Sequence, residues 1–194
     1  MLAKRLLVLD VETTGLDPST DSLVQIASCV LSRKELREKG SFCSYVKPDS
    51  PISAEARSVH GLSEADLTSA PPLHRVIREF AEYAPAEAIL CGHNVSFDVA
   101  FLQAAYRRVG LPYPFDYHTV DLWSIAFFIL GAQRIALPSY DLTALCGLYG
   151  IKRGSKHDAL QDVRVTAKIL THLFAAARAK NLNVLGQFDL FPHR

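Results

Sequence analysis

Two acidic residues follow an apolar run near the start of the chain, and their spacing suggests a shared chemical role. Residues 6–9 are apolar, and Asp10 and Glu12 come directly after them, separated by one residue. On a β-strand, residues i and i+2 project from the same face, about 6.5 to 7 Å apart along the chain. Two carboxylates this close repel each other unless a cation neutralises them, and Mg²⁺ and Mn²⁺ prefer such oxygen ligands. The pair therefore predicts a divalent-cation site, although two acids that merely face solvent would show the same spacing.

Two later segments carry residues that fit the same site. Residues 88–91 are a short apolar run, followed by a glycine turn and by Asp98 in the first turn of an expected helix. A carboxylate there suits the helix dipole, so Asp98 alone would be explained as a capping residue. Further on, His157 stands before an expected helix whose first turns carry Asp162, and Asp158 suits the N-cap of that helix. Three residues are therefore candidates to join the first pair: Asp98, His157 and Asp162.

Apolar patterns place these residues in a fold that combines strands and helices. Apolar runs predict strands at residues 6–12, 23–31, 41–46, 88–91 and 118–122. Helical apolar spacing predicts helices at residues 73–84, 97–109, 123–130, 141–149 and 159–179. The first three strands follow one another, which is typical of an antiparallel meander, and the later strands alternate with helices. This order predicts an α/β fold, in which a mixed sheet has helices on its faces.

Length and composition indicate one ordinary globular domain. The chain has 194 residues, of which 49% are hydrophobic and 21% are charged, and this suits a single buried core. We expect the domain to span residues 1–180 and a tail to occupy residues 181–194. The formal net charge of +1 excludes binding of nucleic acid through bulk charge, so a polyanion would need a local site. The apolar run at the amino terminus is too short for a signal peptide or a membrane span, which predicts a cytoplasmic protein without membrane contact.

Four cysteines are scattered along the chain: Cys29, Cys43, Cys91 and Cys146. They form no CxxC pair, and each has apolar neighbours, which is typical of buried free thiols. We expect these cysteines to be reduced and structural.

Three segments together resemble a known set of catalytic motifs. They are Asp10-Val11-Glu12-Thr13-Thr14-Gly15-Leu16, Gly92-His93-Asn94-Val95-Ser96-Phe97-Asp98 and His157-Asp158-Ala159-Leu160-Gln161-Asp162. Their order and spacing resemble the three exonuclease motifs of the DEDD superfamily, and the His-x4-Asp spacing of the third resembles the DEDDh (DnaQ-like) branch. The resemblance covers residues 6–171. It implies a 3′→5′ exonuclease similar to the group of the DNA polymerase III epsilon subunit, exonuclease X and ribonuclease T. The implied fold is ribonuclease H-like, with a five-stranded mixed sheet flanked by helices.

The resemblance also implies a role for each acidic residue and for the histidine. Two divalent cations, Mg²⁺ with Mn²⁺ as a substitute, would be held by Asp10, Glu12, Asp98 and Asp162. Asp10 would bridge the two ions. Glu12 and Asp162 would hold the ion that carries the attacking water, and Asp98 would bind the second ion. His157 would be the general base, because an imidazole that titrates at about pH 6.5 accepts a proton at neutral pH.

Further residues would bind the substrate, a nucleic acid with a free 3′ end. The resemblance implies that the backbone of residues 13–15 holds the terminal 3′-OH and that Leu16 stacks against its base. The implied contacts are Thr13, Thr14, Gly15, Leu16, His60, Asn94 and Phe97. An ordinary strand-ending turn would equally explain residues 13–16. The basic run at residues 152–156 could contact phosphates or simply be solvated.

The last residues form an apolar segment on a polar linker. Gln187, Phe188, Asp189, Leu190 and Phe191 resemble the bacterial sliding-clamp binding pentapeptide, with Phe188 in place of the usual Leu. Leu190 and Phe191 would fill an apolar pocket, and the tether would raise the local concentration of the enzyme at DNA ends. Alternatively, the segment packs on its own domain. A clamp partner favours DNA over RNA as the substrate.

The leading hypothesis is a two-metal-ion 3′→5′ exonuclease that releases nucleoside monophosphates from DNA 3′ ends in proofreading or repair, either freestanding or with a DNA polymerase. One alternative is an exoribonuclease that trims RNA 3′ ends, because a preference for the 2′-hydroxyl is not visible in a sequence. Another is a non-catalytic module that binds DNA ends and the clamp. Such a module would be expected to have lost a metal ligand, whereas all four acids are present.

Overall fold

The computed structural model describes residues 4–31, 38–154 and 158–179, which are arranged around a five-stranded sheet. The strands are β1 (Leu6–Thr13), β2 (Leu23–Leu31), β3 (Glu38–Tyr45), β4 (Ile89–Gly92) and β5 (Thr119–Asp121). Their spatial order is β3-β2-β1-β4-β5. The pairs β3–β2 and β2–β1 are antiparallel, whereas β1–β4 and β4–β5 are parallel. The predicted meander and mixed sheet are therefore confirmed, with β1 at the centre.

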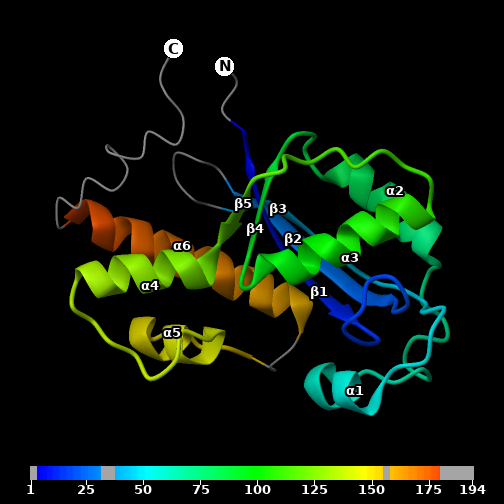
Figure 1. Cartoon of the computed structure of the whole chain (residues 1–194), viewed down its shortest axis with the longest axis horizontal. Helices are drawn as coiled ribbons and strands as arrows, with labels where there is room; N and C mark the ends of the chain where they lie inside the picture. The colour runs from blue at the N-terminus through cyan, green and yellow to red at the C-terminus, as the bar shows by residue number, and fades with distance from the viewer. Residues whose placement is uncertain (1–3, 32–37, 155–157, 180–194) are drawn as a thin grey trace.

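Helices cover both faces of the sheet (Figure 1). They are α1 (Ala54–His60), α2 (Leu73–Tyr83), α3 (Val95–Arg108), α4 (Leu122–Ala132), α5 (Leu142–Tyr149) and α6 (Ala159–Ala179). Helices α4, α5 and α6 share one core with Leu6 and Val8 of β1, whereas α2 and α3 share the other core with Leu7 and Leu9. This alternation buries β1 on both sides, as its uninterrupted apolar sequence predicts.

Helix α1 is missing from the sequence-based prediction because it buries no side chain and so has no apolar repeat. Its sequence signals are its caps. The Ser53 hydroxyl accepts a hydrogen bond from the Ala56 amide at 3.0 Å, and Gly61 ends the helix with a φ of 74°. The helix matters for the site because His60 is its last residue.

Other departures from the predicted elements are small. Strand β3 begins at Glu38 rather than at residue 41, and α3 begins at Val95 rather than at residue 97. All four cysteines are free, and three of them are buried as expected. Cys43 is exposed, which corrects the prediction of a buried thiol, because it lies on β3 at the edge of the sheet.

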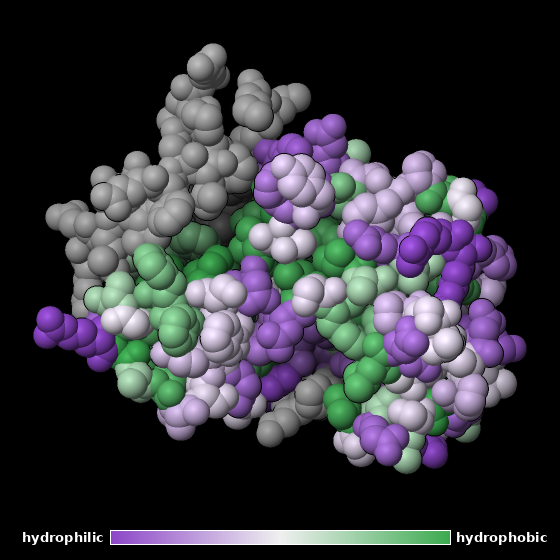
Figure 2. Space-filling model, viewed as in Figure 1, coloured by the Kyte–Doolittle hydropathy of each residue, from purple (hydrophilic) through white to green (hydrophobic). Residues whose placement is uncertain are grey.

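The surface is mixed in polarity, with hydrophobic side chains gathered over α4 (Figure 2). Trp123, Phe127 and Phe128 of this helix are exposed, and the rings of Trp123 and Phe127 stack with their centroids 5.3 Å apart. Within the part of the chain that the structure describes, no helix is both long enough and apolar enough to cross a membrane.

Candidate active site

Asp10 and Glu12 lie on the same face of β1, near the end of the strand. Because side chains alternate along a strand, both point to the face that carries Leu6 and Val8, which is covered by α6. Glu12 is only 7% exposed although its side chain is ionisable. The i, i+2 spacing therefore brings the two carboxylates together beneath α6, as predicted for a strand.

Asp98 reaches the same part of β1 from the start of α3. Strand β4 is too short to pair with the end of β1, so the Val11 N–H extends past it and donates to the Asp98 carboxylate at 2.9 Å. The turn between β4 and α3 comes close to β1, since a Cβ on Gly92 would lie only 2.9 Å from the Leu9 carbonyl oxygen. Asp98 is 4% exposed. Its bond to Val11 fixes it beside the backbone that joins the two acids of β1.

Asp162 lies in the first turn of α6 and is 3% exposed. Its carboxylate accepts two hydrogen bonds from Arg153, at 2.9 Å from Nε and 2.6 Å from Nη2. Arg153 Nη1 also donates to the Thr143 hydroxyl of α5 at 3.1 Å. The Arg153 side chain is 11% exposed. Arg153 is therefore not the solvated residue that a basic run suggests, because its guanidinium is paired with Asp162.

The carboxylates oppose one another's ionisation. Burial raises the pKa of Glu12 to about 8, and the charges of Asp162 and Asp98 add to this rise. Burial likewise raises the pKa of Asp98 to about 8, although a backbone hydrogen bond acts in the opposite direction. Burial and the charges of Asp98 and Glu12 raise the pKa of Asp10 well above its ordinary value. The site therefore holds protons near neutral pH unless a cation supplies positive charge.

This set of carboxylates, of which Glu12, Asp98 and Asp162 are buried and Asp10 is half-buried, suits hard divalent cations, which take carboxylates and relieve their repulsion. The four residues that could hold such ions are Asp10, Glu12, Asp98 and Asp162. As the side chains lie, no three Asp, Glu, His or Cys residues of the described ranges are grouped around a common ion position. Two of the carboxylates have other partners, Asp98 on Val11 and Asp162 on Arg153. An ion bound at Asp162 would compete with the Arg153 guanidinium for this carboxylate.

The turn after β1 brings several predicted substrate contacts together: Thr13, Thr14, Gly15, Leu16 and His60. His60 Nδ1 accepts from the Leu62 amide at 3.0 Å, so its Nε2 donates to the Thr13 carbonyl oxygen at 3.2 Å. Thr14 is fully buried; its amide donates to the Ser22 carbonyl, and its hydroxyl accepts from the Ser22 amide, both at 2.9 Å. Thr14 therefore closes the turn. Leu16 is 85% exposed and is available to meet a ligand.

Asn94 and Phe97 lie on the helix that carries Asp98. Asn94 is the exposed N-cap of α3 and has a left-handed φ of 60°. Phe97 is half-buried, and its ring centroid lies 4.9 Å from that of Phe101. Both residues therefore lie close to Asp98 along the chain, and their contact with a nucleotide stays a prediction.

Some predicted features lie outside the described residues. They are the predicted general base His157 and the tail residues Gln187, Phe188, Asp189, Leu190 and Phe191. In the sequence, His157 precedes α6 by two residues. The domain boundary at residue 180 likewise stays a prediction.

Two polar residues outside the predicted site hold its elements together. Gln25 is 4% exposed on β2, and its Oε1 accepts from the Ala159 amide at the start of α6, at 3.3 Å. Asp121 ends β5 and accepts from the Val95 amide at 3.1 Å and from the Ser124 amide at 3.0 Å, so it connects α3 with α4. A lone glutamine within the apolar run at residues 23–31 was a signal that could have identified Gln25.

Comparison with known proteins agrees with this architecture. Residues 7–170 match the sequence model of the RNase_T family, which is described as an exonuclease family. The DNA polymerase III subunit epsilon-like protein of Rhodobacter capsulatus is 33% identical over 182 residues, which cover 92% of this chain and 25% of that protein. The DNA polymerase III PolC-type of Bacillus subtilis is 29% identical over 175 residues, which cover 90% of this chain and 12% of that protein. This chain thus spans a quarter or less of these relatives.

A solved structure has the same fold. The chain of E. coli exonuclease I in complex with a dT13 oligonucleotide matches with a TM-score of 0.81 at 20% identity, over 96% of this chain and 44% of that chain. The predicted ribonuclease H-like fold is therefore confirmed. Since the family match runs over residues 7–170, the chain belongs to the RNase_T exonuclease family, which confirms the predicted relationship to DnaQ-like 3′→5′ exonucleases.

Proposed function

We propose that this chain is a two-metal-ion 3′→5′ exonuclease that releases nucleoside monophosphates from DNA 3′ ends. One observation carries the proposal: β1, α3 and α6 bring acidic side chains together where burial raises the pKa values of Asp10, Glu12 and Asp98, and at Asp10 and Glu12 the charges of the neighbouring carboxylates add to the rise. Such a cluster destabilises the metal-free fold, so its presence indicates a functional role. Cation binding is the role that suits it, because a cation relieves the repulsion among the carboxylates. The names of the polymerase III relatives support DNA as the substrate.

Asp10, Glu12, Asp98 and Asp162 would hold two Mg²⁺ ions, for which Mn²⁺ would substitute. When bound, the cations would neutralise charge on the scissile phosphate and make water more acidic. His157 would accept the proton of the attacking water, since in the sequence it precedes by two residues the helix that carries Asp162. The division of the carboxylates between the two ions is part of the same proposal, with Asp10 bridging them.

The terminal nucleotide would lie against the turn after β1. Leu16 projects from this turn and would stack on the terminal base, and the backbone of residues 13–15 would face the 3′-OH. Since the His60 imidazole is hydrogen-bonded to the Thr13 carbonyl, α1 would flank the bound nucleotide on one side. Asn94 and Phe97, at the start of α3, would line the other side.

Labelled substrates test this proposal. With Mg²⁺, 3′-labelled single-stranded DNA should release labelled mononucleotide at once, whereas 5′-labelled DNA should give a ladder of shortening products. Asp10→Asn should abolish hydrolysis, and His157→Ala should reduce it about 100-fold or more. Glu82→Gln, which removes an exposed carboxylate on α2, is the matched control and should be fully active. Undiminished activity of either site variant would exclude the assignment.

The same assay separates the alternative functions. Faster hydrolysis of RNA than of DNA of the same sequence would identify an RNA 3′-trimming exoribonuclease. Binding of 3′ ends without hydrolysis in Mg²⁺ or Mn²⁺ would identify a non-catalytic module.

Partners are a further part of the proposal. The relationship to polymerase III proteins supports association with a DNA polymerase, and residues 187–191 would bind a bacterial sliding clamp in the cytoplasm. A chain truncated after Gly186, and a full-length chain with Leu190→Ala and Phe191→Ala, should both fail to bind purified clamp. Clamp binding equal to that of the intact chain would exclude the role of the tail.

A further inference from the structure

The turn between β1 and β2 (residues 14–22, the β1–β2 turn) has one defined conformation. Its backbone closes where the Asp17 carbonyl accepts from the Asp21 amide at 2.8 Å, and the Asp21 carboxylate accepts from the Asp17 amide at 2.9 Å. Asp17 also accepts from the amide and hydroxyl of Ser19, at 2.8 and 2.7 Å. A Cβ on Gly15 would collide with the Asp21 carboxylate, so a larger residue there would have to displace the Asp21 side chain.

Thr14 and Ser22 bury the two ends of the β1–β2 turn, but burial does not hold the residues between them, because residues 15–21 are all exposed or half-buried. The structure supplies another anchor, Arg108. Its Nη1 donates to the Asp21 carbonyl oxygen at 2.8 Å, and its Nη2 donates to the carbonyl oxygens of Pro18 and Ser19 at 3.0 and 3.1 Å. One guanidinium therefore binds three carbonyl groups of the turn, which suits its planar fork of donors.

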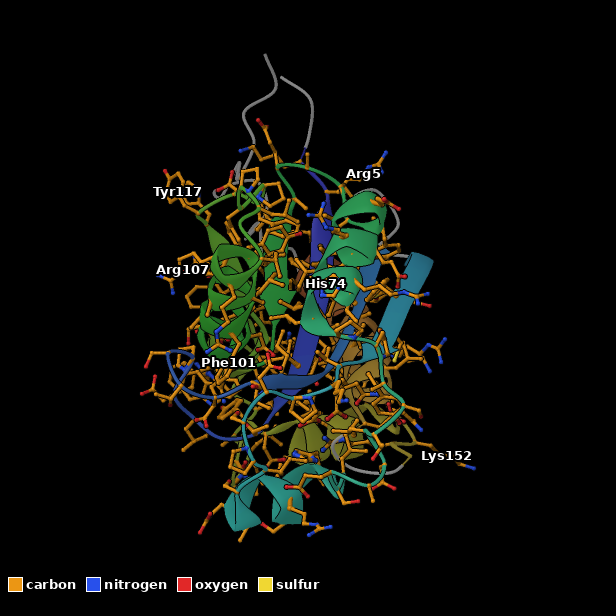
Figure 3. All side chains as sticks on the ribbon, turned by 90° about the vertical axis from the view of Figure 1, so that its right-hand side faces the viewer. Arg5, His74, Phe101, Arg107, Tyr117 and Lys152 are labelled. Atoms are coloured by element: carbon orange, nitrogen blue, oxygen red, sulfur yellow. The ribbon has the colours of Figure 1, made fainter. Side chains whose placement is uncertain are left out.

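Arg108 is the last residue of α3, the helix that carries Asp98 in its first turn. The two residues are ten positions apart, about 15 Å along a helix axis. Asp98 is bonded to Val11 of β1, and α3 is packed into the core through Phe101 and Tyr106. Figure 3 labels Phe101 and Arg107 of this helix, and Arg107 is the residue before Arg108, whose guanidinium contacts the β1–β2 turn. The helix thus connects the carboxylate site rigidly with the turn.

We propose that Arg108 is a positioning residue for the terminal nucleotide. By binding three carbonyl groups of the β1–β2 turn, it holds Leu16 at a fixed place relative to Asp98. This inference rests on the proposed function, in which Leu16 stacks on the terminal base. Arg108 itself contacts the turn and not the substrate, so its removal should weaken binding of the 3′ end and leave the hydrolytic step nearly intact.

Steady-state kinetics on single-stranded DNA test the proposal. Arg108→Gln should raise KM about tenfold with kcat changed less than about twofold, since the lost interaction places the substrate in the ground state as well as the transition state. Arg108→Lys keeps the charge but not the fork, and it should resemble Arg108→Gln. Arg107→Gln removes the same charge from the exposed neighbouring position and should leave KM within about twofold of the wild type. Recovery of KM in Arg108→Lys, or an equal rise in Arg107→Gln, would show that surface charge alone matters and would overturn the proposal.

A double-mutant cycle tests whether Arg108 affects KM through Leu16. If Arg108 acts by placing Leu16, then Arg108→Gln should have little effect in a chain that already carries Leu16→Ala. If the double variant raised KM by the product of the two single-variant effects, the two residues would act independently, and this would contradict the proposal.

Amide hydrogen exchange keeps the test independent of activity. Exchange of residues 15–21 should become at least about tenfold faster in Arg108→Gln, with exchange in α6 unchanged, because only the turn loses its anchor. If the wild type does not hydrolyse DNA, the proposed function fails while this result still shows whether Arg108 holds the turn. Faster exchange with an unchanged KM would overturn the positioning role alone, and unchanged exchange would overturn the anchor itself.

Discussion

Arg153 donates two hydrogen bonds to the carboxylate of Asp162, so a fixed positive charge occupies one of the carboxylates proposed to bind metal. Both side chains are nearly buried, at 11% and 5% exposure, which strengthens a charge-assisted pair of this geometry. The pair offsets part of the repulsion among the carboxylates of the site. A cation that binds Asp162 competes with this guanidinium, and the competition should lower the apparent metal affinity.

Replacing Arg153 should therefore have opposite effects on folding and on metal binding. In Arg153→Gln, the metal-free protein should be less stable by about 1–3 kcal/mol, because Asp162 loses a charged partner. The same variant should bind Mn²⁺ about tenfold more tightly, since no guanidinium competes for the Asp162 carboxylate. Calorimetric titration with Mn²⁺ measures the affinity. Lys152→Gln removes a charge from the exposed neighbouring position and should change neither quantity appreciably. Weaker Mn²⁺ binding by Arg153→Gln would show that Arg153 supports the metal site instead of competing for it.

The metal-free protein should lose stability as the pH rises. Burial raises the pKa values of Glu12 and Asp98 from 4.5 and 3.8 to about 8. Between these limits the folded chain binds more protons than the unfolded chain, so the free energy of unfolding falls with increasing pH. In EDTA, the unfolding midpoint should be roughly 5 °C or more lower at about pH 9 than at about pH 6, given about 2–4 °C per kcal/mol at this size.

Two controls identify the groups behind this pH dependence. A variant with Glu12→Gln and Asp98→Asn should show a much flatter profile, because it lacks both titrating carboxyls. Mg²⁺ should raise the midpoint of the wild type most at high pH, where the carboxylates are ionised and ready to bind it. A wild-type midpoint that climbs with pH in EDTA would contradict the raised pKa values.

Local sequence patterns were enough to predict the strand and the helix that carry most of the acidic residues of the site. The apolar run of residues 6–9 and the long 3.6-residue period at residues 159–179 correspond to β1 and α6, the second with the same bounds. The i, i+2 spacing was enough to predict that Asp10 and Glu12 share one face, because side chains alternate along a strand. Helix α1 was not predicted, because a helix without a buried side chain has no apolar repeat in its sequence.

Tertiary contacts of the site were beyond such patterns. The Gln25 side chain meets the Ala159 amide across 134 residues, and no local rule relates the two positions. Arg153 belongs to a basic run whose composition is that of a solvated loop, and only the fold shows that it turns toward Asp162. Sequence therefore identified the acids through their motifs, whereas the residues that position and neutralise them required the structure.

Gln25 should matter for the start of α6. In Gln25→Leu, the Ala159 amide loses its acceptor, which should cost about 1–3 kcal/mol of stability because a buried donor is left without a partner. Since Asp162 lies in the same first turn, kcat should also fall. Denaturant unfolding and single-stranded DNA hydrolysis measure the two effects. Gln103→Leu, at an exposed position of α3, should stay within about 0.5 kcal/mol of the wild type. Equal stability of the two variants would exclude a structural role for the Gln25 hydrogen bond.

Two glycine substitutions should have opposite effects on the stability of the protein, because only one of the two positions is crowded. A Cβ on Gly92 would lie 2.9 Å from the Leu9 carbonyl oxygen and 3.1 Å from Val95 Cγ2, so Gly92→Ala forces the turn before α3 away from β1. We expect a loss of about 1–3 kcal/mol and, because Asp98 is displaced from Val11, a large fall in hydrolysis. Gly131 lies within α4, where a Cβ meets nothing within 4 Å, so Gly131→Ala should stabilise the protein by about 0.5–1 kcal/mol and leave hydrolysis unchanged. Thermal unfolding and the DNA assay measure both variants. Full activity in Gly92→Ala would show that the close approach of the turn to β1 does not set the position of Asp98.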